Sequence, residues 1–150
     1  MFYLLFVIFF VMLEYGLKTY AEKKLGDGQT FSILKGKIRL CRYHNEGAFL
    51  NLMESRKKVL LLISLILTGM ITLLFLLTLF HRGNRLLKLG LSLLLGGAFS
   101  NTYDRLKKKY VVDYFSFNSP FPALNRMVFN LSDFAILIGS LLLAATSLSK

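Results

Sequence analysis

An uncharged run of 22 residues, Val59 to Phe80, constrains the fold of this chain more than any other feature. A helix needs about 20 apolar residues to cross a bilayer, so this run is long enough to span a membrane. The composition agrees, because 55% of the 150 residues are hydrophobic and the mean hydropathy is +0.55. A soluble domain of this size would need more polar surface. We therefore expect an integral membrane protein.

Three further apolar segments lie before and after this run. The first reaches spanning length if it continues past Glu14 and if Lys18 extends its amine toward water. It lacks a preceding basic residue and a following cleavage site, which favours a retained helix over a signal peptide. Small residues at Gly96 and Gly97 would let another helix or a ligand approach closely. The sequence predicts one integral membrane domain over residues 1–150, mainly α-helical, with four transmembrane helices at about 2–20, 59–80, 86–102 and 128–148.

Two long connections each contain a segment typical of a β-strand. Residues 37–43 largely alternate between basic and apolar side chains, and glycines mark turns around them. Residues 110–115 form a second strand-like run, followed by a loop with two prolines. An even number of spans separates the two connections, so we expect them on the same side of the membrane. They predict a small β-rich platform there, with both termini on the opposite side.

The chain is strongly basic, with 19 Lys and Arg against 8 Asp and Glu, and a net charge of +11. In a soluble protein this would suggest nucleic acid, but here the basic residues lie between apolar segments. We expect contacts with anionic membrane lipids and none with nucleic acid. The single cysteine, Cys41, excludes an internal disulfide, and two scattered histidines are too few for a metal site. We expect neither a metal nor a cofactor.

Three aspartates, Asp104, Asp113 and Asp133, are the only acids after residue 54. Carboxylates at or near membrane depth are costly unless they have a partner or a chemical role. Asp104 precedes Arg105 and a run of lysines, which favours a structural ion pair. Asp113 lies in the strand-like run and Asp133 in the first turns of an apolar helix, where basic residues are scarce. These last two aspartates are therefore the candidates for chemistry.

A carboxylate pair requires the fold to bring Asp113 and Asp133 together. If they meet, their repulsion raises the pKa of one of them, and the pair shares a proton. Such a pair can deprotonate a water molecule and protonate a leaving amine, as in aspartic proteases. The spacing alone does not show that they meet, and two separate interfacial aspartates remain the alternative.

Five short motifs, in order along nearly the whole chain, resemble those of one family. They are LEYGLK, HNEGAF, GAFSNTYDR, VVDY and FNLSD, at residues 13–18, 44–49, 97–105, 111–114 and 129–133. Each is weak alone, but their order on a four-helix hydropathy pattern is specific. On these motifs, the chain resembles the bacterial lipoprotein signal peptidase (signal peptidase II) family.

The resemblance implies an intramembrane aspartyl endopeptidase that removes signal peptides from diacylglyceryl-modified prolipoproteins. Water activated by the dyad would cleave before the lipidated cysteine. We expect a monomer whose partners are these substrates and membrane lipids. The residues carried over are the catalytic dyad Asp113 and Asp133, the substrate-binding or dyad-supporting Asn45, Asn101, Arg105 and Asn130, and the structural Glu14, Lys18 and Asp104.

Three residues depart from the usual family pattern. Glu14 stands in place of Asp, Ser100 in place of Gly and Ser132 in place of Ala. The added Ser132 hydroxyl could hydrogen-bond Asp133. The Glu14 and Ser132 departures motivate an alternative, a non-catalytic member that binds lipoproteins or signal peptides, although a binder has little reason to keep two costly aspartates. An unrelated structural membrane protein would not explain the motifs.

The distribution of basic residues conflicts with the orientation that the family implies. The connections at residues 18–58 and 103–127 carry ten and five Lys or Arg, against three at residues 81–88. The positive-inside rule would place the two long connections in the cytoplasm. The resemblance implies a multi-pass protein of the bacterial cytoplasmic membrane with the platform and active site at the outer face. We follow the resemblance, because the motifs are more specific than a charge count.

Overall fold

The computed structural model describes residues 1–26, 28–47, 56–81 and 83–148. Ala48 and Phe49, the end of the second motif, lie outside the described residues. Within the described ranges the elements are, in order, α1 (Phe2–Lys24), β1 (Phe31–Ile33), β2 (Ile38–Asn45), α2 (Lys57–Leu79), α3 (Arg85–Lys107), β3 (Val111–Phe117), α4 (Pro122–Asn125) and α5 (Leu131–Leu148).

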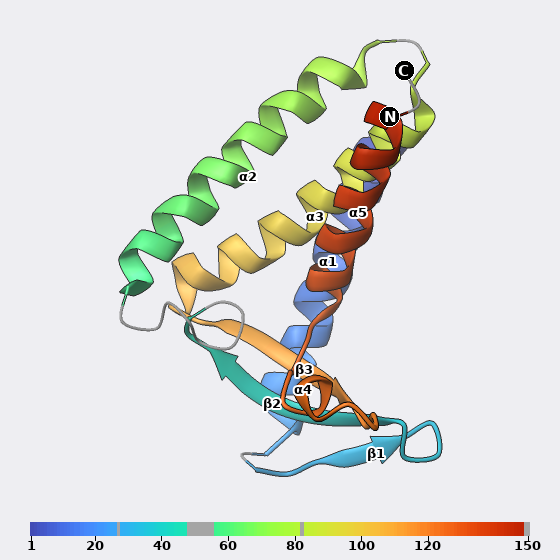
Figure 1. Ribbon diagram of the computed structural model, residues 1–150. Coiled ribbons are helices and arrows are strands. Elements are labelled where there is room, and N and C mark those ends of the chain that lie inside the picture. The colour runs from blue at the N-terminus through green and yellow to red at the C-terminus, as the bar shows by residue number, and fades with distance from the viewer. Residues whose placement is uncertain (27, 48–55, 82, 149–150) are drawn as a thin grey trace.

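Helix α3 lies at the centre of the molecule and packs against α1, α2 and α5. The strands and α4 lie at one end, whereas both termini and the connection between α2 and α3 lie at the other (Figure 1). Helices α2 and α5 diverge toward the end with the strands. The two long connections therefore share one end of the molecule, which agrees with the predicted platform.

Among the described residues, three helices are long and apolar enough to cross a membrane: α1, α2 and α5. Only 17% of each spanning window is buried inside the protein, so most of its apolar side chains face outward. A helix in a soluble protein buries its apolar stripe, whereas a helix that is apolar all round suits lipid. The surface of these helices is therefore that of a membrane protein.

The prediction of four transmembrane helices is met only in part, because α3 is not among these three. Helix α3 is as long as α1 and α2, with 23 residues, but it is far more polar. Its central position explains this composition, since it presents polar groups to other helices instead of to lipid. Its buried polar side chains are Lys88, Ser92, Ser100, Asn101, Thr102 and Asp104.

The close contact between α3 and α5 depends on glycines. A Cβ added at Gly97 would lie 2.5 Å from the backbone oxygen of Ser132, and one at Gly139 would lie 2.7 Å from that of Gly90. Only residues without a side chain allow two helix backbones to approach this closely. The predicted close approach at Gly97 is present, and it brings the beginning of α5 against α3.

The platform is a three-stranded antiparallel sheet in the order β1–β2–β3. Strands β2 and β3 were predicted, whereas the three-residue β1 is too short for an alternating pattern to reveal. In the β2–β3 register, Asn45 lies opposite Val111 and Tyr43 opposite Asp113. Asn45 is thus a diagonal neighbour of Asp113 on the same face. The sheet therefore places the Asn45 amide next to the Asp113 carboxylate.

Candidate active site

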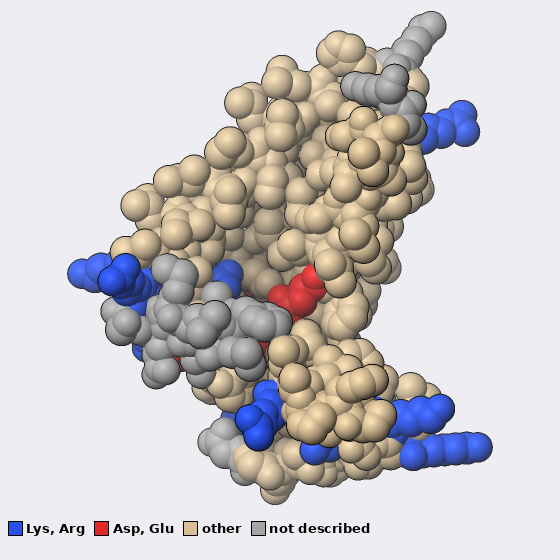
Figure 2. Space-filling view, viewed as in Figure 1, with Lys and Arg blue, Asp and Glu red and all other residues tan. Residues whose placement is uncertain are grey.

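A cavity of about 570 Å³ lies between α2, α3 and α5, next to the sheet. Its walls are mostly apolar, with Leu67, Ile71 and Ile136 among the lining residues. Figure 2 shows the hollow, with uncharged walls in tan and carboxylates in red at its lower end. An apolar cavity with a few convergent polar groups is the usual form of a ligand site. The polar lining residues include Asn45, Asn101, Arg105, Asp113 and Asp133.

Asn130 joins the two aspartates. Its Nδ2 donates to Oδ1 of Asp113 at 2.6 Å, and its backbone N–H donates to Oδ2 of Asp133 at 3.0 Å. Asn130 follows Phe129, which pairs with Phe115 of β3 as an isolated bridge. This bridge holds the start of α5 against the strand that carries Asp113. The fold thus brings Asp113 and Asp133, 20 residues apart in sequence, to the same cavity.

The start of α5 fixes the position of Asp133. The backbone N–H of Asp133 donates to Oδ1 of Asn130 at 3.1 Å, while the Asp133 carboxylate accepts the backbone N–H of Asn130. This reciprocal arrangement is a capping box, in which the residue before the helix and the third helical residue bind each other's N–H. The Asp133 carboxylate is therefore held by the geometry of the helix end itself.

Two more amides support the carboxylates. Nδ2 of Asn45 donates to Oδ2 of Asp113 at 2.9 Å, and Nδ2 of Asn101 donates to Oδ1 of Asp133 at 3.1 Å. Each aspartate thus accepts hydrogen bonds on both oxygens, one of them from Asn130. The structure places three of the predicted supporting residues, Asn45, Asn101 and Asn130, in direct contact with the pair.

The environment of Asp113 shifts its ionisation toward neutral pH. Burial and the nearby Asp133 charge raise the pKa of Asp113 to about 7, although hydrogen bonds from Asn45 and Asn130 oppose the shift. At neutral pH this arrangement can hold one proton between two carboxyl groups. Among the described residues, no group of three or more His, Cys, Asp or Glu is arranged to hold a metal ion.

Arg105 lines the cavity without a hydrogen bond to either carboxylate in the described part of the structure. Its Nη1 lies 3.5 Å from the backbone oxygen of Asn101. Within the described ranges, Nε of Arg105 and Oδ1 of Asn45 are buried without a hydrogen-bond partner. Both residues line the cavity, so a guanidinium and an amide lie at its polar end.

The residues predicted to be structural form a buried cluster behind the pair. Asp104 pairs with Lys18 at 3.0 Å and with Lys108 at 3.1 Å, so its partner among the nearby basic residues is a lysine and not Arg105. Nζ of Lys18 also donates to Oδ1 of Asn101 at 2.8 Å. A lysine can only donate, so it turns the amide oxygen of Asn101 toward itself and the NH₂ group toward Asp133.

The prediction that the Ser132 hydroxyl hydrogen-bonds Asp133 is wrong. The Ser132 hydroxyl donates to Oε1 of Glu14 on α1, at 3.0 Å. Successive residues of an α-helix point about 100° apart, so Ser132 faces α1 when Asp133 faces the cavity. The sequence motif places the two residues side by side but does not show which direction each one faces.

Sequence reasoning missed the hydroxyl groups on the wall formed by α2. Thr68 and Thr102 share a buried hydrogen bond of 2.9 Å that joins α2 to α3, and both line the cavity with Ser64. The signal is a spacing of four, with Ser64, Thr68 and Thr72 forming one stripe in a run, residues 59–77, that has no other polar side chain. That stripe marks the side of α2 that faces the protein.

Comparisons with known proteins point to one family. Curated relatives described as lipoprotein signal peptidase include those of Clostridium novyi, 28% identical over 93% of each chain, and Lactiplantibacillus plantarum, 31% identical over 91% of this chain and 87% of that one. A protein of the same description from Shouchella clausii is 33% identical over 75% of this chain and 70% of its own.

Solved structures share the fold. One described as a bacterial membrane enzyme at 2.3 Å resolution has a TM-score of 0.81 at 22% identity and covers 98% of this chain and 87% of its own. A second, at 1.9 Å, has a TM-score of 0.80 at 21% identity, over 97% and 92%. Residues 6–149 match the family described as "Signal peptidase (SPase) II". Because the match covers nearly the whole sequence, this chain belongs to the signal peptidase II family of aspartic peptidases.

Proposed function

We propose that this chain is an intramembrane aspartyl endopeptidase that removes signal peptides from diacylglyceryl-modified prolipoproteins, cutting before the lipidated cysteine. The observation that carries the proposal is the placement of Asp113 and Asp133 at the polar end of one apolar cavity, joined by Asn130. Aspartic peptidases use two buried carboxyl groups that share a proton. The amide contacts to all four carboxylate oxygens hold the pair ready for this reaction.

The reaction needs one ionised and one protonated carboxyl group. The ionised group removes a proton from a water molecule, which attacks the scissile carbonyl carbon, while the protonated group donates to the carbonyl oxygen. The tetrahedral intermediate then collapses as the leaving amine takes a proton from the pair. A pKa of about 7 for Asp113 supports this arrangement, because the pair then keeps a proton at neutral pH.

Two polar side chains beside the dyad suit a peptide backbone. The Arg105 guanidinium can donate to a substrate carbonyl, and the Asn45 side chain can accept a substrate N–H, because both side chains line the cavity. A peptide in an apolar site has few other partners for these groups, so each contact contributes to binding and alignment. The apolar walls suit the hydrophobic part of a signal peptide.

The proposal includes a place in the cell. The whole chain acts as one membrane-embedded unit, a monomer, in the bacterial cytoplasmic membrane, with the sheet and dyad at the outer face. Helix α3 is the fourth crossing: its 23 residues extend about 35 Å, and α1, α2 and α5 shield its polar side chains from lipid. A dyad next to the sheet lies near the membrane surface, where the diacylglyceryl group begins.

The test is cleavage of a diacylglyceryl prolipoprotein by the purified protein in detergent, beside Asp113→Asn and Asp133→Asn. We expect cleavage by the parent and loss of at least about 10³-fold in both variants, the scale of removing a group on which the chemistry depends. Glu22→Gln is a matched control, because Glu22 contacts His44 and Tyr110 and not the dyad. Binding of the substrate by a folded parent without cleavage would favour the non-catalytic alternative.

A further inference from the structure

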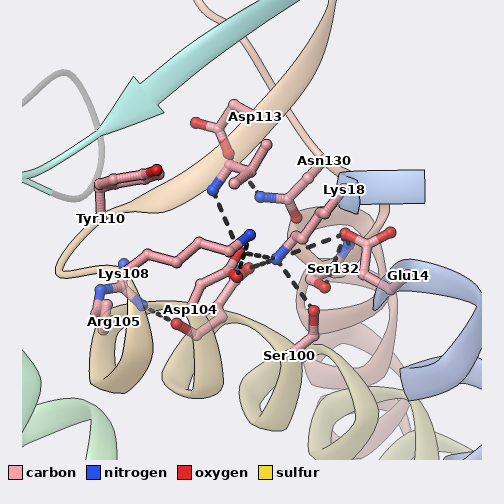
Figure 3. A network of polar contacts seen from close by, with 12 residues as sticks. Glu14, Lys18, Ser100, Asp104, Arg105, Lys108, Tyr110, Asp113, Asn130 and Ser132 are labelled. Carbon is pink, nitrogen blue, oxygen red and sulfur yellow. Dashed lines mark hydrogen bonds and ion pairs between the residues drawn. The ribbon is translucent and has the colours of Figure 1, made fainter. Parts of the chain in front are cut away.

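The Glu14 carboxylate lies on α1, behind the cavity, and is 0% exposed. Its Oε1 accepts the backbone N–H of Ser132 at 3.1 Å and the Ser132 hydroxyl at 3.0 Å. Its Oε2 accepts the hydroxyl of Tyr114 at 2.8 Å. Figure 3 shows Glu14 beside Ser132, on the side of the network away from Asp113. One carboxylate thus binds groups from both α5 and β3.

The partners of Glu14 are the chain neighbours of the two aspartates. Tyr114 follows Asp113 on β3, and Ser132 precedes Asp133 on α5. The Tyr114 hydroxyl also accepts the backbone N–H of Leu131 at 3.1 Å, which ties β3 directly to the first turn of α5. The position of Glu14 therefore affects both backbones within one residue of the dyad.

A lysine one turn further along α1 completes the network. Nζ of Lys18 lies 3.8 Å from Oε1 of Glu14 and donates to the Ser100 hydroxyl at 3.0 Å. Two carboxylates, Glu14 and Asp104, are matched by two amines, the buried Lys18 and the partly exposed Lys108. A buried ion pair holds its two groups in one geometry, because separating them would leave an uncompensated charge inside the protein.

The three departures from the usual family residues all lie in this network. Glu14 and Ser132 contact each other directly, and Ser100 contacts Lys18. A glutamate reaches one methylene further than an aspartate, and the Ser132 hydroxyl gives Oε1 a second hydrogen bond that an alanine could not supply. The longer acid and the added hydroxyl therefore fit each other.

We propose that Glu14 is a positioning residue which, through Ser132 and Tyr114, sets the separation of Asp113 and Asp133. The inference rests on the proposed peptidase function. A displacement of about 1 Å at reacting groups costs on the order of 100-fold in rate, so small shifts of β3 against α5 lower turnover. Glu14, Tyr114 and Ser132 are not among the residues that line the cavity, so we expect the Michaelis constant to stay unchanged.

The test compares kcat and KM for Ser132→Ala and Tyr114→Phe, each of which removes one hydroxyl bound to Glu14. We expect each variant to lower kcat about fivefold and to leave KM unchanged. A factor of this size corresponds to the loss of one typical hydrogen bond that aligns the dyad. The matched controls are Ser92→Ala, a buried serine bonded only to the Lys88 oxygen among the described contacts, and Tyr110→Phe, whose hydroxyl bonds Glu22. Both controls should keep the parental kcat.

A double substitution tests the fit between Glu14 and Ser132. Glu14→Asp shortens the acid and leaves the buried Ser132 hydroxyl without its acceptor, so we expect kcat to fall about tenfold or more. Adding Ser132→Ala removes that unpaired hydroxyl. The double variant should therefore be more active than the product of the two single effects predicts.

Parental kcat in both Ser132→Ala and Tyr114→Phe, in folded protein, would overturn the inference even if melting temperatures fell. If Glu14→Asp does not fold, Ser132→Ala and Tyr114→Phe still test the inference. Asp113→Asn and Asp133→Asn in the same assay test the function separately. Activity in those variants, or an inactive folded parent, refutes the peptidase proposal and the inference with it. Their inactivity beside fully active hydroxyl variants refutes the inference alone.

Discussion

At the scale of single residues, the ionisation of Asp113 controls the proposed chemistry. Its pKa of about 7 means that the pair loses its shared proton as the pH rises above neutrality. Without that proton, the site has no acid for the carbonyl oxygen and the leaving amine. We expect kcat/KM to fall about tenfold per pH unit well above pH 7. A profile from pH 6 to 9 measures this, and a flat profile would show that the pair does not titrate there.

The same pKa predicts a stability effect of Asp113→Asn. The folded pKa of about 7 lies above the ordinary value of 3.8, so the folded parent binds the proton more tightly. The parent therefore loses stability as the pH rises from about 4 to about 7, by at most about 4 kcal/mol. Asparagine does not titrate, so the difference in Tm between variant and parent should grow in the variant's favour from pH 5 to pH 8. A constant difference would contradict this account.

The residue types of the site were predictable from the sequence, but most of their contacts were not. The motifs identified Asp113, Asp133 and their supporting amides. The bridging role of Asn130 depends on the start of α5, and the Ser132 contact with Glu14 depends on the rotation of that helix. Such directions are set by packing between distant segments, which a local motif does not record.

At the scale of elements, the glycine contacts between α3 and α5 separate stability from catalysis. A Cβ at Gly97 would meet the Ser132 backbone, one residue from Asp133, whereas a Cβ at Gly90 would meet the Gly139 oxygen and side chains of α5 outside the residues that line the cavity. We expect Gly97→Ala to lower both Tm and kcat, and Gly90→Ala to lower Tm alone. Each overpacked contact should cost about 1–3 kcal/mol.

Gly69→Ala is the matched control for these two variants. Gly69 lies on α2, and an added Cβ would meet nothing within 4 Å. Alanine is the better helix former, so this variant should keep the parental Tm or exceed it. Equal losses of kcat in Gly97→Ala and Gly90→Ala would argue that general loosening, and not the position of Asp133, limits turnover.

The elements themselves were predicted unevenly. Apolar length identified α1, α2 and α5, because a lipid environment demands a continuous apolar surface. Apolar length identifies α3 poorly, because the other helices cover α3 and its side chains do not need to suit lipid. Strand β1 is defined by its pairing with β2, and three residues carry too little pattern to reveal it.

At the scale of the whole molecule, the end with the strands carries most of the basic residues, and their distribution bears on the orientation of the protein in the membrane. Several of its basic side chains are used inside the fold. Lys18 is buried, Arg39 donates to the backbone oxygen of Asn125, Arg42 donates to that of Glu22, and Arg105 lines the cavity. The positive-inside rule concerns charges in loops near the membrane, and charges built into a folded platform are weaker evidence for the cytoplasmic side.

We therefore expect the sheet outside the cell membrane and the ends of α1 and α5 inside. Single cysteines at Lys35, on the exposed turn of the platform, and at Ser147, near the end of α5, report the two sides in a Cys41→Ser background. A membrane-impermeant maleimide added to intact cells should label Lys35→Cys alone, and Ser147→Cys should react only after the membrane is opened. The reverse pattern would place the platform in the cytoplasm. The dyad would then lie on the side opposite to the one proposed, although the geometry that joins Asp113 to Asp133 would be unchanged.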